Sequence, residues 1–198
     1  MSFAKSSVFE ITADFYSLLP LYIGKRRNSM KLYAKPSFHL QYQFDRSIPM
    51  VRGDTMKIAA YQFAVTNNLD QNMKQIQKAL LQASHMGVKL LVFPECALAG
   101  YPPRDLKNSS SVSFHELASA FQKLEKLSAD YAIHLIVGTV IQENKSCYNS
   151  AALFSPNQKP AFYHKRALWG WDQDNFCMGT EKGVFKIEGW SIGIPYML

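Results

Sequence analysis

The sequence is poor in cysteine, and none of its cysteines lies in a paired spacing. Cys96, Cys147 and Cys177 are far apart and form no C-x-x-C pair, which argues against a disulfide framework and against a structural zinc site. No apolar run reaches the roughly 18 residues of a membrane span, and the first residues lack the basic, apolar, small-residue order of a signal peptide. We therefore expect a soluble, cytoplasmic domain that needs no metal and no cofactor.

Glycine and proline are also sparse, at 10 and 9 of 198 residues, and no repeat is visible. These absences exclude collagen-like, low-complexity and solenoid chains. With 47% hydrophobic and 19% charged residues, the chain is too apolar for disorder and long enough for one sizeable core.

The charge is unevenly distributed along the chain. Residues 1–55 hold eight Lys and Arg against four Asp and Glu, out of a net charge of +7 for the whole chain. The Lys25-Arg26-Arg27 cluster could attach to nucleic acid or to an anionic membrane, or it could be a solvated tail. We favour the tail, because no nucleic-acid motif accompanies the charge, and we predict neither a nucleic-acid nor a membrane partner. No sustained period of 2 or 3.6 runs through residues 1–55, which we leave as an unassigned basic extension.

From Met56 onward the pattern is that of an α/β fold. Residues 57–63 and 89–93 are mostly apolar and predict buried strands, and residues 70–85 between them carry an apolar stripe at helical spacing. The connections are short, so this β-α-β unit predicts parallel strands in a covered sheet, with Gly87 ending the helix.

A second helix is expected over residues 114–131, where Ser113 and Glu116 have the spacing of a capping box. Further strands are expected at residues 133–141, 148–154, 161–164, 184–187 and 190–194, the last two forming a hairpin around Gly189. The middle strands read as an antiparallel meander joined to the parallel unit.

Two charged residues follow predicted strands at the edge where catalytic groups of α/β sheets collect. Glu95 comes after Pro94 at the end of the second strand, and Lys165 follows the strand at residues 161–164. A carboxylate there could act as a general base, and a lysine among aromatic residues could stabilise an oxyanion. An exposed loop carboxylate and a surface lysine with a buried stem are the plainer interpretations.

The blocks Lys57-Ile-Ala-Ala-Tyr-Gln, Phe93-Pro-Glu95 with Gly100-Tyr101, Tyr148-Asn-Ser-Ala and Tyr163-His-Lys165 resemble the nitrilase (carbon-nitrogen hydrolase) superfamily in order and spacing. The resemblance covers residues 56 to about 194. It implies an α-β-β-α sandwich and a Glu-Lys-Cys triad that cleaves amide, carbamoyl or nitrile C–N bonds. Glu95 then corresponds to the base and Lys165 to the oxyanion-stabilising cation. Asp172 is a shortened, shifted counterpart of a substrate-positioning glutamate, or else an ordinary loop or N-cap aspartate.

The resemblance fails at the nucleophile, because Met197 stands where the family has its cysteine. A thioether has no proton to lose and cannot form an acyl-enzyme. Cys96, Cys147 and Cys177 do not occupy that position, and we interpret them as structural or incidental thiols, although a substitute nucleophile among them stays an alternative.

The sequence thus predicts a truncated α-β-β-α sandwich of the nitrilase type, with residues 56–198 as a partial domain. We expect an amidohydrolase-like chain that lacks its cysteine and turns over no amide or nitrile. The alternative function is a non-catalytic interaction module that dimerises through the sandwich surface, so a homo-oligomer is the expected macromolecular partner.

Overall fold

The computed structural model describes residues 56–194, together with two short strands from the N-terminal segment, β1 (Phe9–Glu10) and β2 (Tyr22–Gly24). The Lys25-Arg26-Arg27 cluster and Met197 lie outside the described residues. The sequence predicted no helix or strand in residues 1–55, whereas the structure has the strands β1 and β2 there.

Five strands form the first sheet, in the order β3-β4-β5-β6-β7. Their bounds are Ile58–Ala60 (β3), Leu90–Val92 (β4), His134–Glu143 (β5), Ser146–Phe154 (β6) and Ala161–His164 (β7). The pairs β3–β4 and β4–β5 are parallel, whereas β5–β6 and β6–β7 are antiparallel. The predicted parallel unit followed by a meander is therefore confirmed.

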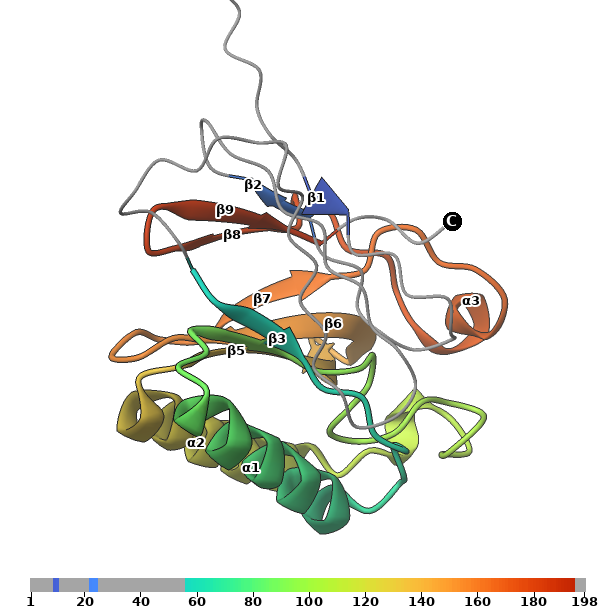
Figure 1. The fold of residues 1–198 in the computed structure, drawn as a ribbon. Coiled ribbons are helices and arrows are strands. Elements are labelled where there is room, and N and C mark those ends of the chain that lie inside the picture. Colours follow the sequence, from blue (N-terminus) through green and yellow to red (C-terminus); the bar gives the residue numbers. More distant parts are fainter. Residues whose placement is uncertain (1–8, 11–21, 25–55, 195–198) are drawn as a thin grey trace, which may run out of the picture.

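Helices α1 (Leu69–His85) and α2 (Phe114–Tyr131) cover one face of this sheet (Figure 1). Their stripes supply Met73, Ile76 and Leu80 from α1 and Leu117 and Leu124 from α2, and these side chains are buried against inward residues of the strands. Burial of such stripes holds the helices on the sheet, because the hydrophobic effect scales with the apolar area removed from water.

The helix ends differ in detail from the sequence expectations. Gly87 has the expected positive φ of 67° after α1. Ser113 precedes α2, but its side chain makes no capping hydrogen bond, so the predicted capping box does not form there. The side-chain cap belongs instead to Asn68, whose Oδ1 accepts the Gln71 amide at 2.9 Å at the start of α1.

The second sheet has the order β1-β2-β9-β8 and packs on the other face of the first sheet (Figure 1). Strands β8 (Val184–Ile187) and β9 (Trp190–Gly193) form the predicted hairpin, and its turn residues Glu188 and Gly189 both have positive φ. A second apolar core fills the space between the sheets, with Phe185, Ile192 and Ile194 packed against residues such as Leu90 and Ile136. The described residues thus form α, β and β layers in that order.

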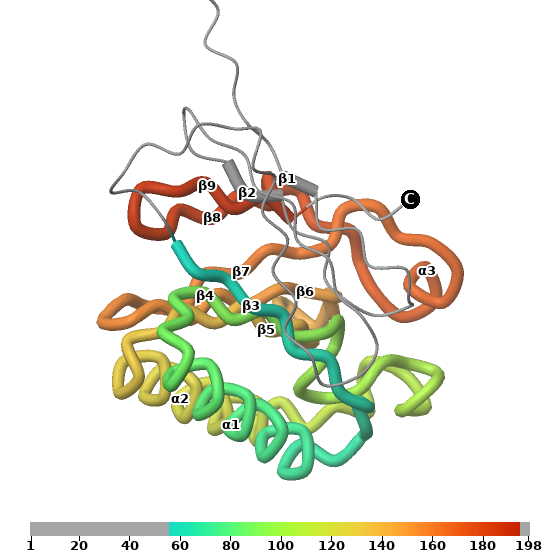
Figure 2. The backbone as a smooth tube through the Cα atoms, in the orientation of Figure 1, coloured from blue at the N-terminus to red at the C-terminus, as the bar shows by residue number. Residues whose placement is uncertain are grey.

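Two short helical segments complete the described elements, the 3-10 helix Ser109–Ser111 and α3 (Trp171–Asn175). The loop after β4 and the segment carrying α3 lie at the same end of the sheets (Figure 2). Within the described part of the chain, no helix combines the length and the apolar character that crossing a bilayer requires.

Candidate active site

Four polar side chains from four different segments meet at this end of the first sheet. Glu95 follows β4, Asn149 lies within β6, Lys165 follows β7, and Asp172 lies in the first turn of α3. All four are buried or half-buried, with side-chain exposures of 13% for Glu95, 17% for Lys165 and 2% for Asp172. Residues from the parallel and the antiparallel part of the sheet thus lie together at one end of it.

Glu95 is held by a tight passage of its backbone across β5. Phe93 donates its amide to Ile136 O at 2.9 Å, and Leu98 donates to Gly138 O at 3.2 Å, so the chain between them crosses directly over Gly138. A Cβ at Gly138 would lie 2.7 Å from Glu95 Cα and would also meet the Pro94 carbonyl and the Cys96 amide. Only glycine fits at this point of β5, and the close approach fixes the position of the Glu95 backbone.

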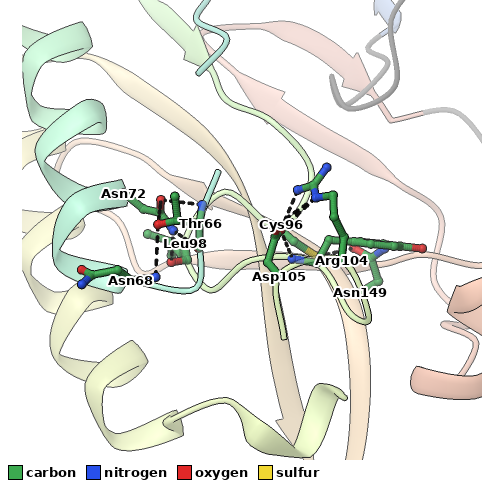
Figure 3. A network of polar contacts seen from close by, with 9 residues as sticks. Thr66, Asn68, Asn72, Cys96, Leu98, Arg104, Asp105 and Asn149 are labelled. Carbon is green, nitrogen blue, oxygen red and sulfur yellow. Dashed lines mark hydrogen bonds and ion pairs between the residues drawn. The ribbon is translucent and has the colours of Figure 1, made fainter. Parts of the chain in front are cut away.

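The loop after Glu95 is tied to α1 by the buried side chain of Asn72 (Figure 3). Asn72 Nδ2 donates to Leu98 O at 2.9 Å and to Thr66 O at 2.6 Å, and its Oδ1 accepts the Thr66 amide at 3.1 Å. Because these bonds satisfy backbone groups inside the fold, they restrict movement of the segment that carries Glu95.

An ion cluster forms the centre of the site. Lys165 Nζ lies 3.1 Å from Glu95 Oε1 and 2.6 Å from Asp172 Oδ2. Burial lowers the pKa of Lys165, but the charges of Glu95 and Asp172 and their hydrogen bonds outweigh it, so this pKa lies above its ordinary value of 10.5. The lysine is therefore a fixed cation at neutral pH.

Asn149 also joins the two carboxylates, and at Glu95 it binds the same oxygen as the lysine does. Its Nδ2 donates to Glu95 Oε1 at 2.6 Å and to Asp172 Oδ1 at 3.2 Å. The Cys96 thiol lies 3.7 Å from Asn149 Oδ1 and donates to it, which orients the amide with its NH₂ group toward Glu95 and Asp172. Asn149 thus keeps Glu95 and Asp172 close to each other without adding charge.

Tyr101 supplies a further hydrogen bond to Asp172. Its hydroxyl donates to Asp172 Oδ1 at 2.7 Å, and its ring lies 6.4 Å from that of Trp171 on α3. Burial raises the pKa of Tyr101 well above its ordinary value, and the bond to Asp172 raises it further. The phenol therefore stays a neutral donor and holds Asp172 beside Lys165.

Cys96 sits next to Glu95 in sequence but is unsuited to nucleophilic attack. The residue is completely buried and has a positive φ of 50°. Burial raises the pKa of the Cys96 thiol well above its ordinary value of 9.0, and the charges of Glu95 and Asp172 raise it further. Because the thiolate is the reactive form, this cysteine is a structural donor to Asn149.

The proximity expected of Glu95 and Lys165 is found, and Asp172 joins them. Asp172 is not the N-cap of α3, a position held by Gly170. The catalytic and substrate-positioning roles of these residues stay predictions. Sequence reasoning gave no role to Asn149 or Tyr101, because neither stands out from its neighbours in a local pattern. Across the described ranges, His, Cys, Asp and Glu residues form no group of three that could hold a metal ion.

The sequence of this chain matches a known protein family. The family model described as carbon-nitrogen hydrolase matches residues 57–194. A glutamine-dependent NAD(+) synthetase from Synechocystis is 38% identical over 128 residues, covering 59% of this chain and 22% of the relative. A protein N-terminal amidase from Schizosaccharomyces pombe is 33% identical over 147 residues, covering 67% of this chain and 49% of the relative.

Among solved structures, a mutant of the amidase from Nesterenkonia sp. AN1 matches with a TM-score of 0.62 at 26% identity, covering 70% of this chain and 54% of the amidase. That structure shows the acetamide moiety of fluoroacetamide covalently added at the active-site cysteine of the amidase. The chain thus spans about a fifth to a half of the length of these relatives. From the family match and the shared fold, the chain belongs to the carbon-nitrogen hydrolase family, the nitrilase superfamily.

Proposed function

We propose that this chain carries the base and the oxyanion-stabilising cation of a site that hydrolyses primary carboxamides, and that residues 56–194 hold no thiol placed to act as its nucleophile. The observation that carries the proposal is the position of Lys165 Nζ between Glu95 Oε1 and Asp172 Oδ2. The family membership and the amide chemistry named for the N-terminal amidase and the Nesterenkonia amidase support the choice of carboxamides.

Glu95 is suited to the role of general base by the way its oxygens are used. Asn149 and Lys165 both donate hydrogen bonds to Oε1 of Glu95, and neither of them donates to Oε2 in the described structure. A carboxylate oriented through one oxygen can take a proton on the other, which is the geometry that general base catalysis requires. Glu95 would accept the proton of a thiol and then deliver it to the departing ammonia.

Lys165 is suited to stabilising the oxyanion. An ammonium group has three N–H donors, and Glu95 and Asp172 take two of them in the described structure. The third can bind an oxygen on which negative charge develops as a thiolate adds to the carbonyl carbon. A preorganised donor of this kind contributes about 3 kcal/mol to transition-state stabilisation.

The nucleophile is the part that this chain does not supply from its described residues. Cys96 is buried with a raised thiol pKa, and the resemblance assigns the nucleophile's position to Met197. Loss of a covalent nucleophile costs on the order of a millionfold in turnover. We therefore propose that the chain as given releases no measurable ammonia from acetamide, butyramide or glutamine.

Introducing a thiol tests both parts of the proposal. The Met197→Cys variant should release ammonia from carboxamides and form an acyl adduct visible by mass spectrometry, whereas the Met197→Ser control should do neither. Adding Glu95→Gln to Met197→Cys should lower the rate about 100-fold or more, because the thiol loses its base.

Three outcomes would contradict the proposal. Glu95-dependent ammonia release by the unaltered chain would show that another nucleophile is present. Turnover by Met197→Cys that is insensitive to Glu95→Gln would remove the base role. A thiol at position 197 that never reacts with a carboxamide would remove the assignment of that position.

A further inference from the structure

The outer edge of β9 is paired with a strand that comes from far away in the sequence. Tyr22, Ile23 and Gly24 of β2 lie opposite Gly193, Ile192 and Ser191 of β9 in antiparallel register. We propose that this edge of β9 is a strand-docking surface, that its occupant is the chain's own β2 segment, and that β2 keeps the edge from pairing with a second copy of the chain.

The direction of the β9 amides shows which groups β2 covers. Ile194 donates its amide to Gly183 O at 2.7 Å, on the β8 side of the strand. Successive amides of a strand point to opposite sides, so that of Ile192 also faces β8. The amides of Ser191 and Gly193 therefore face β2, and the amides of Tyr22 and Gly24 face β9 in return.

Without β2, the β8–β9 hairpin would keep its core contacts but expose this edge. Phe185, Ile187, Trp190 and Ile192 are buried against the first sheet, so the inward face of the hairpin is anchored. A two-stranded hairpin with an open edge nevertheless presents a row of unpaired N–H and C=O groups, which is a template for another strand. β2 satisfies these groups, and β1 pairs with the far side of β2.

The same edge of a second copy is the competing occupant. Two β9 edges can pair antiparallel about a twofold axis through Ile192, because such an interface is self-complementary. The β2 segment has the advantage of being joined covalently to β3 through residues 25–55. A linked segment acts at an effective concentration near the millimolar range, which exceeds that of a second copy at micromolar protein.

Hydrogen exchange of the full chain tests the docking. In a Tyr22→Pro variant the amide that faces β9 is gone, and exchange at Ser191 and Gly193 should become about tenfold faster or more. The amides of Ile192 and Ile194, which face β8, are the internal control and should change much less. Tyr22→Ala, which keeps the backbone amide, is the matched control variant, and Gly24→Pro is a second, independent disruption.

A peptide of residues 18–27, added to the Tyr22→Pro protein, should restore protection at Ser191 and Gly193, whereas the same peptide with proline at Tyr22 should not. Sedimentation should show the Tyr22→Pro protein gaining mass with concentration while Tyr22→Ala does not. Unchanged exchange at Ser191 and Gly193 in both proline variants would overturn the docking. Faster exchange without any concentration-dependent association would overturn the role of β2 in keeping a second copy away.

Discussion

Replacing Gly138 by alanine should damage the site by displacing the backbone segment that carries Glu95. The new Cβ would lie 2.7 Å from Glu95 Cα and would also press on the Pro94 carbonyl. These are backbone atoms that cannot rotate aside, so either β5 or the Glu95 segment must move. Overpacking a well-packed site costs up to about 3 kcal/mol. This cost is a large fraction of the free energy of unfolding of a typical domain, which is about 5 to 15 kcal/mol.

Gly87→Ala is the matched control for this prediction. Gly87 has a φ of 67°, but a Cβ there would meet nothing within 4 Å. It should therefore cost only the strain of a left-handed alanine, about 1 kcal/mol. The free energies of unfolding from urea titration compare the two variants.

Hydrogen exchange locates the effect of Gly138→Ala. The Leu98 amide, which donates to Gly138 O at 3.2 Å, should exchange faster in this variant because the loop is pushed off β5. Equal losses of stability in Gly138→Ala and Gly87→Ala, with Leu98 exchange unchanged, would refute the reasoning that close approach at Gly138 positions Glu95.

Three further predictions follow from buried charges and thiols. Lys165→Met should lower the free energy of unfolding by about 3 kcal/mol, because two carboxylates lose their cation, and adding Asp172→Asn should recover part of that loss in the same urea titration. Burial lowers the pKa of His134 below its ordinary value of 6.5. Because the unfolded chain then binds the proton more tightly, the His134 contribution to stability is full above pH 6.5 and decreases as the pH falls below it. Thermal melts between pH 5 and pH 8 should show this slope, and a His134→Gln variant should flatten it. In the folded chain the exposed Cys177 should react with an aromatic disulfide reagent first, and the buried Cys96 should react only on unfolding. Early labelling of Cys96, detected by peptide mass, would contradict its assigned structural role.

The elements that sequence predicted well are those with a strong local pattern. The second helix occupies residues 114–131 as expected, because its apolar stripe repeats at helical spacing over four turns. The β8–β9 hairpin was predictable from Gly189 between two short apolar strands. Glu95 and Lys165 were predictable as neighbours, since each follows a strand at the same edge of one sheet.

The features that sequence reasoning missed depend on partners that are distant in the chain. Asn149 occupies an ordinary position within a strand, and its importance appears only when folding brings Glu95 and Asp172 to its amide. Strands β1 and β2 are only two and three residues long, too short for any periodicity, and β2 is defined by its pairing with β9. Local patterns contain no information about such long-range contacts.

Titration of the Lys165 side chain by NMR tests most directly whether Glu95, Lys165 and Asp172 work as one site. The account predicts that the pKa of Lys165 lies above its ordinary value of 10.5, because two carboxylates outweigh the effect of burial. It also predicts that Glu95→Gln and Asp172→Asn each lower this pKa, while a Glu116→Gln control on α2, outside the cluster, leaves it unchanged. A Lys165 pKa at or below 10.5 that neither substitution alters would contradict the account.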